Sequence, residues 1–120
     1  MLVVDDEGAL RELTRRLLNA RGYNVLTAAS AEEALALCEH APSIDVLLTD
    51  VVMPGASGPE LTRQLVQRRP DLKAIYMSGY TDDALVRHGI LNPGIAFLNK
   101  PFNAQTLERK IRDVLDQQKL

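Results

Sequence analysis

The feature that most constrains the fold is a regular alternation of short apolar runs with longer segments of helical periodicity. Five runs have strand-like character, at residues 1–4, 23–28, 44–50, 72–79 and 95–100. Five other segments carry apolar residues at helical spacing, at residues 7–22, 30–42, 57–70, 81–90 and 103–118. This alternation is typical of an α/β domain in which helices cover both faces of a parallel sheet. Right-handed crossovers restrict such a sheet to a few doubly wound topologies.

Local signals at the segment ends support the helices. Gly22 is placed to cap the carboxyl end of the first one, and Ser30 with Glu33 forms a capping box before the second. Pro59 stands in the first turn of the third. The first helix should pack through Leu10, Leu13, Leu17 and Leu18, and the last through Leu107, Ile111, Val114 and Leu115.

Length and charge exclude several classes of protein. The 120 residues, with neither repeat nor linker, are enough for one hydrophobic core, so we expect a single domain over 1–120. The net charge of −2 indicates neither a nucleic-acid partner nor a membrane contact. We find no signal peptide and no apolar run long enough to cross a bilayer, and therefore expect a cytoplasmic location.

Three isolated residues have ordinary structural interpretations. The only cysteine, Cys38, is predicted to be a small buried apolar residue on the inner side of a helix. His40 and His88 are expected to be surface residues near helix ends and not metal ligands.

Polar residues that could bind a ligand or take part in a reaction stand where the predicted strands end. Asp5 and Asp6 follow the first strand, and Asp50 closes the apolar run "IDVLLTD". Ser78 ends the fourth strand, and Lys100 ends the fifth, directly before a proline. Because the carboxyl ends of parallel strands share one edge of a sheet, we expect these side chains to converge there.

That combination suits phosphoryl transfer to a carboxylate. Three carboxylates in one pocket repel one another, and a hard cation such as Mg²⁺ relieves the repulsion. Asp50 would be the nucleophile, with the metal held by Asp6 and Asp50. Ser78 would donate a hydrogen bond to one phosphoryl oxygen, and Lys100 would pair with another, gaining about 4 kcal/mol at 4 Å and an effective dielectric constant near 20.

Each of these residues also has a plainer interpretation. Asp5 and Asp6 could simply cap the following helix, and Asp50 could be a turn residue. Ser78 alone suggests a loop, and Lys100 alone suggests a solvated turn. Only their joint position at four strand ends favours a site.

The stretches "VVDDE", "LLTDVVMPG", "MSGY" and "FLNKPF" together resemble the receiver domain of two-component response regulators over essentially the whole chain. The resemblance implies a flavodoxin-like (CheY-like) fold: a five-stranded parallel sheet in the order 2-1-3-4-5, with five helices in a three-layer sandwich. It also implies that Asp50 accepts a phosphoryl group in the presence of Mg²⁺ (Mn²⁺ as a substitute).

The resemblance further assigns roles to particular residues. Asp5, Asp6, Asp50 and the backbone carbonyl of Val52 would bind the metal. Ser78 and Phe97 would be the switch residues, and Lys100 would be the lysine that is characteristic of the site in this family. A receiver is a switch and not an enzyme in its own right. Its expected partner is a histidine kinase or a histidine phosphotransfer domain, and a homodimer through the last helix-strand-helix face is a further expectation.

The sequence "MSGYTDDALVRHGI" followed by "AFLNKPF" looks most like receiver domains fused behind hybrid sensor histidine kinases. In that case, we expect the chain to be cut from a longer polypeptide. The alternative is a free-standing response regulator. A phosphatase with an aspartyl nucleophile is disfavoured, because it needs a second acid where Val52 stands. A nucleotide or flavin module lacks its glycine-rich motif, and a receiver that only docks a partner would not need the complete set of site residues.

Overall fold

The structure is a computed structural model that describes residues 1–40, 44–51, 55, 57–78, 96–99 and 102–116. The side chains of Ser78, Ala96, Phe97 and Asn99 also lie outside this description. The strands are β1 (Leu2–Val4), β2 (Leu26–Ala28), β3 (Val46–Asp50), β4 (Lys73–Ser78) and β5 (Ala96–Asn99). The helices are α1 (Gly8–Ala20), α2 (Ala31–His40), α3 (Gly58–Arg68) and α5 (Ala104–Asp116).

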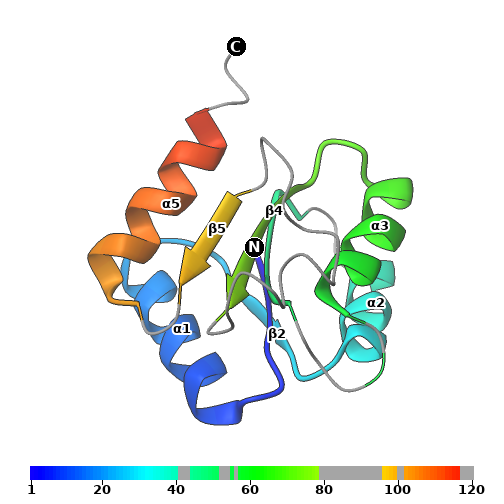
Figure 1. Ribbon diagram of the computed structural model, residues 1–120, viewed down its shortest axis with the longest axis horizontal. Coiled ribbons are helices and arrows are strands. Elements are labelled where there is room, and N and C mark those ends of the chain that lie inside the picture. Colours follow the sequence, from blue (N-terminus) through cyan, green and yellow to red (C-terminus); the bar gives the residue numbers. More distant parts are fainter. Residues whose placement is uncertain (41–43, 52–54, 56, 79–95, 100–101, 117–120) are drawn as a thin grey trace.

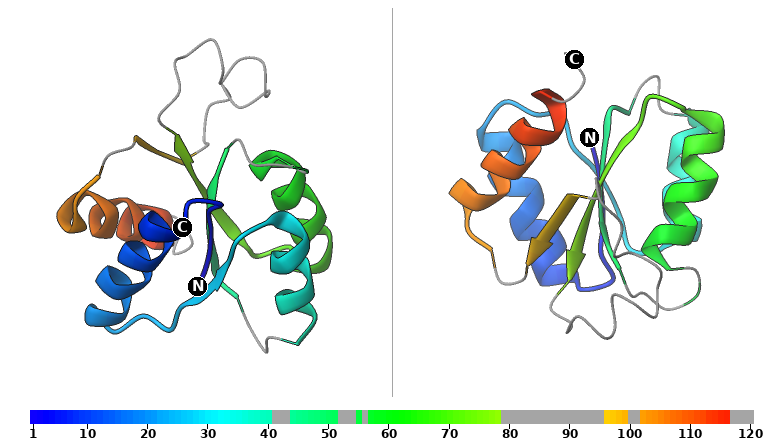
Figure 2. Two further views of the ribbon diagram at one scale, coloured as in Figure 1. Left: turned by 90° about the horizontal axis from the view of Figure 1, so that it is seen from below. Right: turned by 45° about the horizontal axis from the view of Figure 1, so that its top comes forward.

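All described strand pairs are parallel, and the sheet order is β2-β1-β3-β4-β5. Helices α1 and α5 cover one face of the sheet, and α2 and α3 cover the other (Figures 1 and 2). The predicted α/β class and the order 2-1-3-4 are confirmed, and the backbone of β5 pairs with β4. The helix predicted at residues 81–90 lies outside the described residues, so the count of five helices stays a prediction.

Alternation along the strands divides the core between the two faces. Leu2 and Val4 pack in the cluster beneath α2 and α3, whereas Val3 packs in the cluster beneath α1 and α5. Successive side chains of a strand point to opposite faces, so a strand buried on both sides must be apolar throughout. This explains why β1 and β3 are nearly continuous apolar runs.

The helix ends follow the predicted signals with one difference. Gly22 has φ +92°, and the amides of Gly22 and Tyr23 donate to the carbonyls of Asn19 and Leu18, which is a Schellman cap. Ser57 caps α3 by accepting from the Glu60 amide at 3.3 Å.

The capping box of α2 differs in one partner. Ser30 accepts from the Glu33 amide at 3.2 Å, as predicted, but the Glu33 carboxylate accepts from the Ala29 amide, one residue before the cap.

The predicted packing stripe of α1 is wrong at one position. Leu13 is 50% exposed, whereas Thr14 and Leu18 are buried. Residues 14 and 18 are four apart and share one side of the helix, and Leu13 lies about 100° around the axis from Thr14. The stripe of α5 is confirmed, with Leu107, Ile111 and Val114 buried and Leu115 packed against them.

Two remaining predictions about single side chains can be compared with the structure. Cys38 is buried at 5% exposure, and His40 is exposed at the end of α2, both as predicted. His88 lies outside the described residues. Within the described ranges, no helix is both long and apolar enough to cross a membrane.

Candidate functional site

Three carboxylates meet at the edge of the sheet where the strands end. Asp5 and Asp6 directly follow β1, and Asp50 is the last residue of the neighbouring strand β3. One oxygen from each carboxylate lies within 4.8 Å of the other two. Asp5 and Asp50 are buried, at 1% and 6% exposure, and Asp6 is exposed. The predicted convergence of the acids is therefore confirmed.

Hydrogen bonds to other described residues hold Asp5 in place. Its amide donates to the Ala28 carbonyl of β2 at 3.2 Å, and its Oδ1 accepts from the Glu7 amide at 2.9 Å. Its backbone carbonyl accepts from Nη1 of Arg11 at 2.8 Å. The Glu7 amide belongs to the N-cap residue of α1, and that cap has no side-chain hydrogen bond. The contact from Asp5 is therefore a local turn before the helix and does not support the interpretation of Asp5 as a helix cap.

The backbone around Asp50 is fixed by β4 and by the start of α3. Asp50 is in register with Met77, and the Val51 amide donates to the Met77 carbonyl at 3.1 Å. The hydroxyl of Thr49 donates to the Asp50 carbonyl at 3.1 Å. The Gly58 amide at the first residue of α3 donates to the Val51 carbonyl at 2.9 Å.

The cluster has the chemistry of a site for a hard divalent cation. Each carboxylate can supply an oxygen ligand, and at these separations their negative charges repel one another. Mg²⁺ prefers oxygen ligands and binds through a small number of carboxylates while keeping several waters. The half-exposed position of the cluster, with two acids buried and one open, leaves room for those waters. The donor set therefore fits the predicted metal.

The other predicted site residues are described only in part. The backbone of Ser78 ends β4 in register with Asn99, which places it one residue beyond the Asp50–Met77 pair at the same edge. The backbone of Phe97 is in β5, in register with Tyr76. Val52 and Lys100 lie outside the described residues, as do the side chains of Ser78 and Phe97.

Sequence reasoning missed Arg11, Thr49 and Gly58 near the acids. Arg11 is a cation in the first turns of a helix, where the dipole disfavours positive charge, and this conflict was a usable signal. Thr49 is a fully buried hydroxyl next to Asp50. It could have been noticed as a polar residue that follows three consecutive apolar residues in the strand. For Gly58, the sequence indicates a position at the start of a helix but gives no sign of its contact with Asp50.

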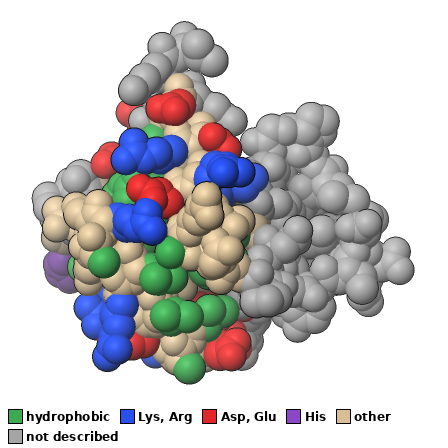
Figure 3. Space-filling view, turned by 90° about the vertical axis from the view of Figure 1, so that its left-hand side faces the viewer, with side chains coloured by type: hydrophobic (Ala, Val, Ile, Leu, Met, Phe, Trp, Pro, Cys, Tyr) green, Lys and Arg blue, Asp and Glu red, His purple; other side chains and the backbone are tan. Residues whose placement is uncertain are grey.

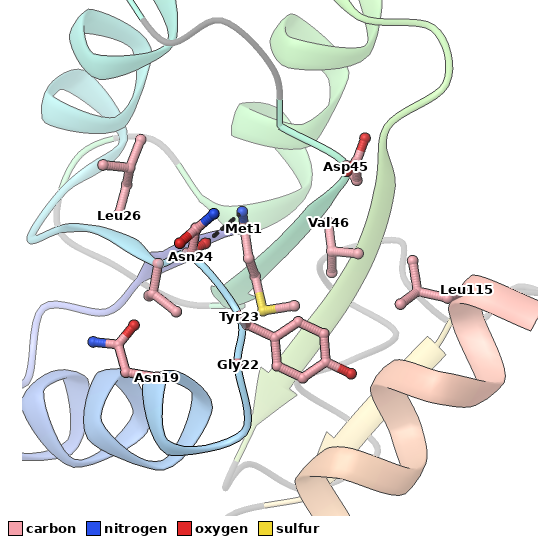
Figure 4. A pocket seen from close by; sticks show the side chains of 10 residues that line it. Met1, Asn19, Gly22, Tyr23, Asn24, Leu26, Asp45, Val46 and Leu115 are labelled. Atoms are coloured by element: carbon pink, nitrogen blue, oxygen red, sulfur yellow. Dashed lines mark hydrogen bonds between the residues drawn. The ribbon is translucent and has the colours of Figure 1, made fainter.

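A cavity of about 620 Å³ lies at the opposite edge of the sheet, where the strands begin (Figure 4). Beside this cavity, the Met1 ammonium group donates to the Asn24 carbonyl at 3.0 Å. Tyr23, from the connection between α1 and β2, and Leu115 of α5 line the cavity. Among the described residues that line it, Asp45 is the one carboxylate. One acid without a second does not provide the ligand set of the cluster, so the cavity is separate from the candidate site.

Comparison with known proteins agrees with this geometry. Residues 1–112 match the family described as response regulator receiver domain. The chain is 40% identical to part of the sensor kinase CckA of Brucella abortus, over 98% of this chain and 13% of that protein. It is 36% identical to part of the hydrogenase transcriptional regulatory protein HoxA of Cupriavidus necator, over 100% of this chain and 25% of that protein. The chain therefore spans only a small share of these relatives.

Solved structures show the same fold over nearly the whole chain. The receiver domain of the hybrid histidine kinase CckA is 39% identical with a TM-score of 0.79, over 95% of this chain and 96% of that one. A response regulator receiver domain protein of Clostridium thermocellum is 33% identical with a TM-score of 0.84, over 98% and 94%. The fold, the acidic cluster and these matches agree: the chain belongs to the response regulator receiver domains, which are phosphoacceptor signalling modules and not catalytic enzymes.

Proposed function

We propose that this domain accepts a phosphoryl group on Asp50 from a phosphohistidine donor, with Mg²⁺ bound at the acidic cluster. The observation that supports this most is the approach of Asp5, Asp6 and Asp50 to within 4.8 Å at the carboxyl edge of the sheet. In the reaction, a carboxylate oxygen of Asp50 would form a bond to phosphorus while the bond from phosphorus to the donor imidazole breaks. The electron pair of that bond leaves with the imidazole nitrogen.

The surroundings of the three acids favour Asp50 as the nucleophile. One oxygen of Asp5 is engaged by the Glu7 amide, and the side chain is almost completely buried. Asp6 is exposed, where water solvates the charge and leaves the side chain free to move. Asp50 combines a low exposure of 6% with a backbone held by Thr49, Met77 and the start of α3. A nucleophile whose backbone is held in this way would lose little freedom on meeting the donor, which supports the choice of Asp50.

The metal would be held by carboxylates of the cluster. Asp6 and Asp50 are the direct ligands in this proposal, together with Asp5 and the backbone carbonyl of Val52. A bound divalent ion would neutralise charge that develops on the phosphoryl oxygens. Mn²⁺ should substitute for Mg²⁺, since it accepts the same oxygen ligands.

Three further residues complete the proposal. Ser78 would donate a hydrogen bond to a phosphoryl oxygen, and Lys100 would form an ion pair with another. Phe97 would adopt a second rotamer when Asp50 is phosphorylated. The face made by the last helix, the last strand and the helix before it would change conformation and pass the signal on. The backbone positions of Ser78 and Phe97 are compatible with these roles.

Labelling with a small phosphodonor tests the function directly. Acetyl phosphate and Mg²⁺ should add one phosphoryl group to the intact protein, detected by mass spectrometry, and the label should be lost on hydroxylamine treatment, as expected for an acyl phosphate. Chelation of the metal should prevent labelling. Asp50→Asn should abolish it, because an amide oxygen is a poor nucleophile towards phosphorus.

Asp45→Asn is the matched control, since it removes a carboxylate at the opposite edge of the sheet. This variant should be labelled like the unaltered protein. Labelling that persists in Asp50→Asn, or that needs no divalent ion, would contradict the proposal.

We further propose that the domain is the receiver module of a hybrid sensor histidine kinase. The likeness to sensor kinases named CckA supports this assignment, at 40% identity to the Brucella abortus protein and 39% to a solved receiver domain of a hybrid kinase. A free-standing response regulator is the alternative, since the same fold occurs in other receivers. The complete reading frame decides between them: a histidine kinase core in the same polypeptide is expected, and a frame that encodes only this domain would contradict it.

The outer surface of α5 could support pairing with a second copy. Arg109, Arg112 and Asp113 are exposed there, and basic and acidic side chains are interspersed over the face formed by α1 and α5 (Figure 3). Glu108 contacts both Arg112 and Arg21, the residue that follows α1, so part of this charge is already paired within the chain. Charge reversal of Arg112 should weaken a phosphorylation-dependent dimer in size-exclusion chromatography, and a monomer at all concentrations before and after phosphorylation would exclude it.

A further inference from the structure

Gly58 lies closer to the candidate phosphoacceptor than a residue with a side chain could. A Cβ atom built at this position would lie 2.2 Å from the backbone oxygen of Asp50 and 3.2 Å from its carbonyl carbon. Real Cβ contacts are essentially never shorter than 3.0 Å. The atoms in the way are backbone atoms, which cannot move aside by a change of rotamer.

The backbone conformation of Gly58 does not itself require glycine. Among the described residues, positive φ angles occur at Gly22 and Gly55 only. Glycine is also a poor choice for a helix, because it loses more conformational freedom on folding than alanine does. The reason for glycine at this position is therefore space, and the space is taken by the Asp50 carbonyl group.

Gly58 contacts two consecutive peptide groups at the end of β3. Its amide donates to the Val51 carbonyl at 2.9 Å, and the side of its Cα that would carry a Cβ atom faces the Asp50 carbonyl. The Asp50 carbonyl also accepts from the Thr49 hydroxyl at 3.1 Å, and the Thr49 methyl group lies 3.3 Å from the position of the Cβ. Gly58 and Thr49, both fully or nearly fully buried, thus enclose the carbonyl from two sides.

We propose that Gly58 and Thr49 are positioning residues that hold the Asp50 carbonyl and thereby fix its carboxylate relative to Asp5 and Asp6. The Cα of Asp50 is attached to both its carbonyl carbon and its side chain, so a shift of the carbonyl group moves the carboxylate as well. Relieving the clash of an added methyl group requires the 2.2 Å approach to become an ordinary contact of at least 3.4 Å. A shift of about 1 Å exceeds the tolerance of about 0.5 Å that a preorganised site requires.

The inference rests on the proposed function in one respect, namely that Asp50 belongs to the metal-binding and phosphoacceptor cluster. Mn²⁺ binding provides a readout that does not depend on phosphorylation. The dissociation constant can be measured from the electron paramagnetic resonance signal of free Mn²⁺, under conditions in which circular dichroism shows each variant to be folded.

Gly58→Ala and Gly8→Ala make a matched pair. Both glycines are the first residue of a helix next to the acidic edge, but a Cβ at Gly8 would meet only the Arg11 guanidinium, at an ordinary 3.6 Å. Gly58→Ala should raise the dissociation constant for Mn²⁺ by about tenfold or more relative to Gly8→Ala, as is typical when groups that orient metal ligands are altered. An increase below about tenfold would overturn the role of Gly58.

Variants at Thr49 keep the test decisive if Gly58→Ala does not fold. Thr49→Val preserves the shape of the side chain and its preference for strands but removes the hydroxyl, and Thr49→Ser retains the hydroxyl. Thr49→Val should weaken Mn²⁺ binding by about threefold or more, and Thr49→Ser should restore it. Equal affinity in the two variants would overturn the proposal, since a purely structural loss would not follow the hydroxyl.

The outcome for the unaltered protein separates this inference from the proposed function. If the protein binds Mn²⁺ but acetyl phosphate does not label it, the proposed function fails while the positioning role can still be measured. If labelling proceeds normally and Gly58→Ala and Thr49→Val both leave the Mn²⁺ affinity unchanged, the positioning role alone fails.

Discussion

The carboxylates of Asp5 and Asp50 lie at the ends of neighbouring strands and approach each other although both side chains are buried. Their exposures are 1% and 6%, and their oxygens fall within the 4.8 Å spread of the cluster. At this separation and an effective dielectric constant near 20, two negative charges repel by about 3 kcal/mol. A cation bound between these two carboxylates would offset their mutual repulsion.

The first prediction concerns Asp6, the exposed member of the cluster. Asp6→Asn should raise the free energy of unfolding by about 1 kcal/mol without metal, because one of three mutually repelling charges is removed and solvent screens part of the effect. The advantage should disappear at saturating Mg²⁺, since the ion stabilises the protein that binds it more tightly. Urea unfolding in EDTA and in Mg²⁺ measures both differences. An Asn variant that is less stable than the unaltered protein in EDTA would refute this account of the charges.

The second prediction concerns Gly22, which ends α1 with φ +92°. A Cβ at this position would meet no atom within 4 Å, so the cost of Gly22→Ala comes from the backbone conformation alone. That cost should be about 1 kcal/mol in the free energy of unfolding, measured by urea titration. The Mn²⁺ affinity should not change, because the cap lies at the edge opposite to the acids. A variant of unaltered stability would show that the cap can relax to a negative φ.

The sequence was sufficient to predict the order of the elements and the meeting of the acids. Both follow from local rules: strands that are apolar throughout must be buried on both faces, and parallel strands bring their carboxyl ends to one edge. Asp50 could thus be placed beside Asp5 without coordinates. The Gly22 cap was predictable for a similar reason, because few residues other than glycine tolerate the conformation that ends a helix in this way.

The relations that sequence reasoning missed depend on how elements pack. The sequence places Gly58 at the start of a helix, and only the close approach of α3 to the Asp50 carbonyl shows why this residue is glycine. The hydroxyl of Thr49 could equally have faced solvent at a strand edge. Leu13 fits a helical stripe as well as Leu17 does, and the rotation of α1 on the sheet decides which of them is covered. The spacing of apolar residues predicts that a helix has a buried stripe, but packing against the neighbouring elements decides which residues lie at the centre of that stripe.

The third prediction uses this difference on α1. Leu13 is 50% exposed and Leu18 is 1% exposed. Leu18→Ala should lower the free energy of unfolding by about 2–5 kcal/mol, because it leaves a cavity beneath α1 and α5. Leu13→Ala should change it by less than about 0.5 kcal/mol, as is usual for a surface substitution. Chemical denaturation of both variants gives the comparison, and equal losses would mean that Leu13 is covered in solution.

The fourth prediction concerns the titration of Cys38 in α2. Burial raises the pKa of the Cys38 thiol above its ordinary value of 9.0, and the positive charges of Arg69 and Arg68 oppose the shift. The folded protein therefore holds the neutral thiol more strongly than the unfolded chain does. The corresponding stability is fully present below about pH 9 and is lost as the pH rises through the higher folded value.

Alkylation of Cys38 provides the measurement. Iodoacetamide should react slowly with the folded protein at neutral pH, because the reactive thiolate is scarce and the side chain is only 5% exposed. The rate should rise towards that of the urea-unfolded chain as the pH is raised above 9. Cys38→Ala should flatten the alkaline decline in the free energy of unfolding, because the shifted group is then absent. A folded protein that is alkylated at neutral pH as fast as the unfolded chain would contradict both the burial of this thiol and its raised pKa.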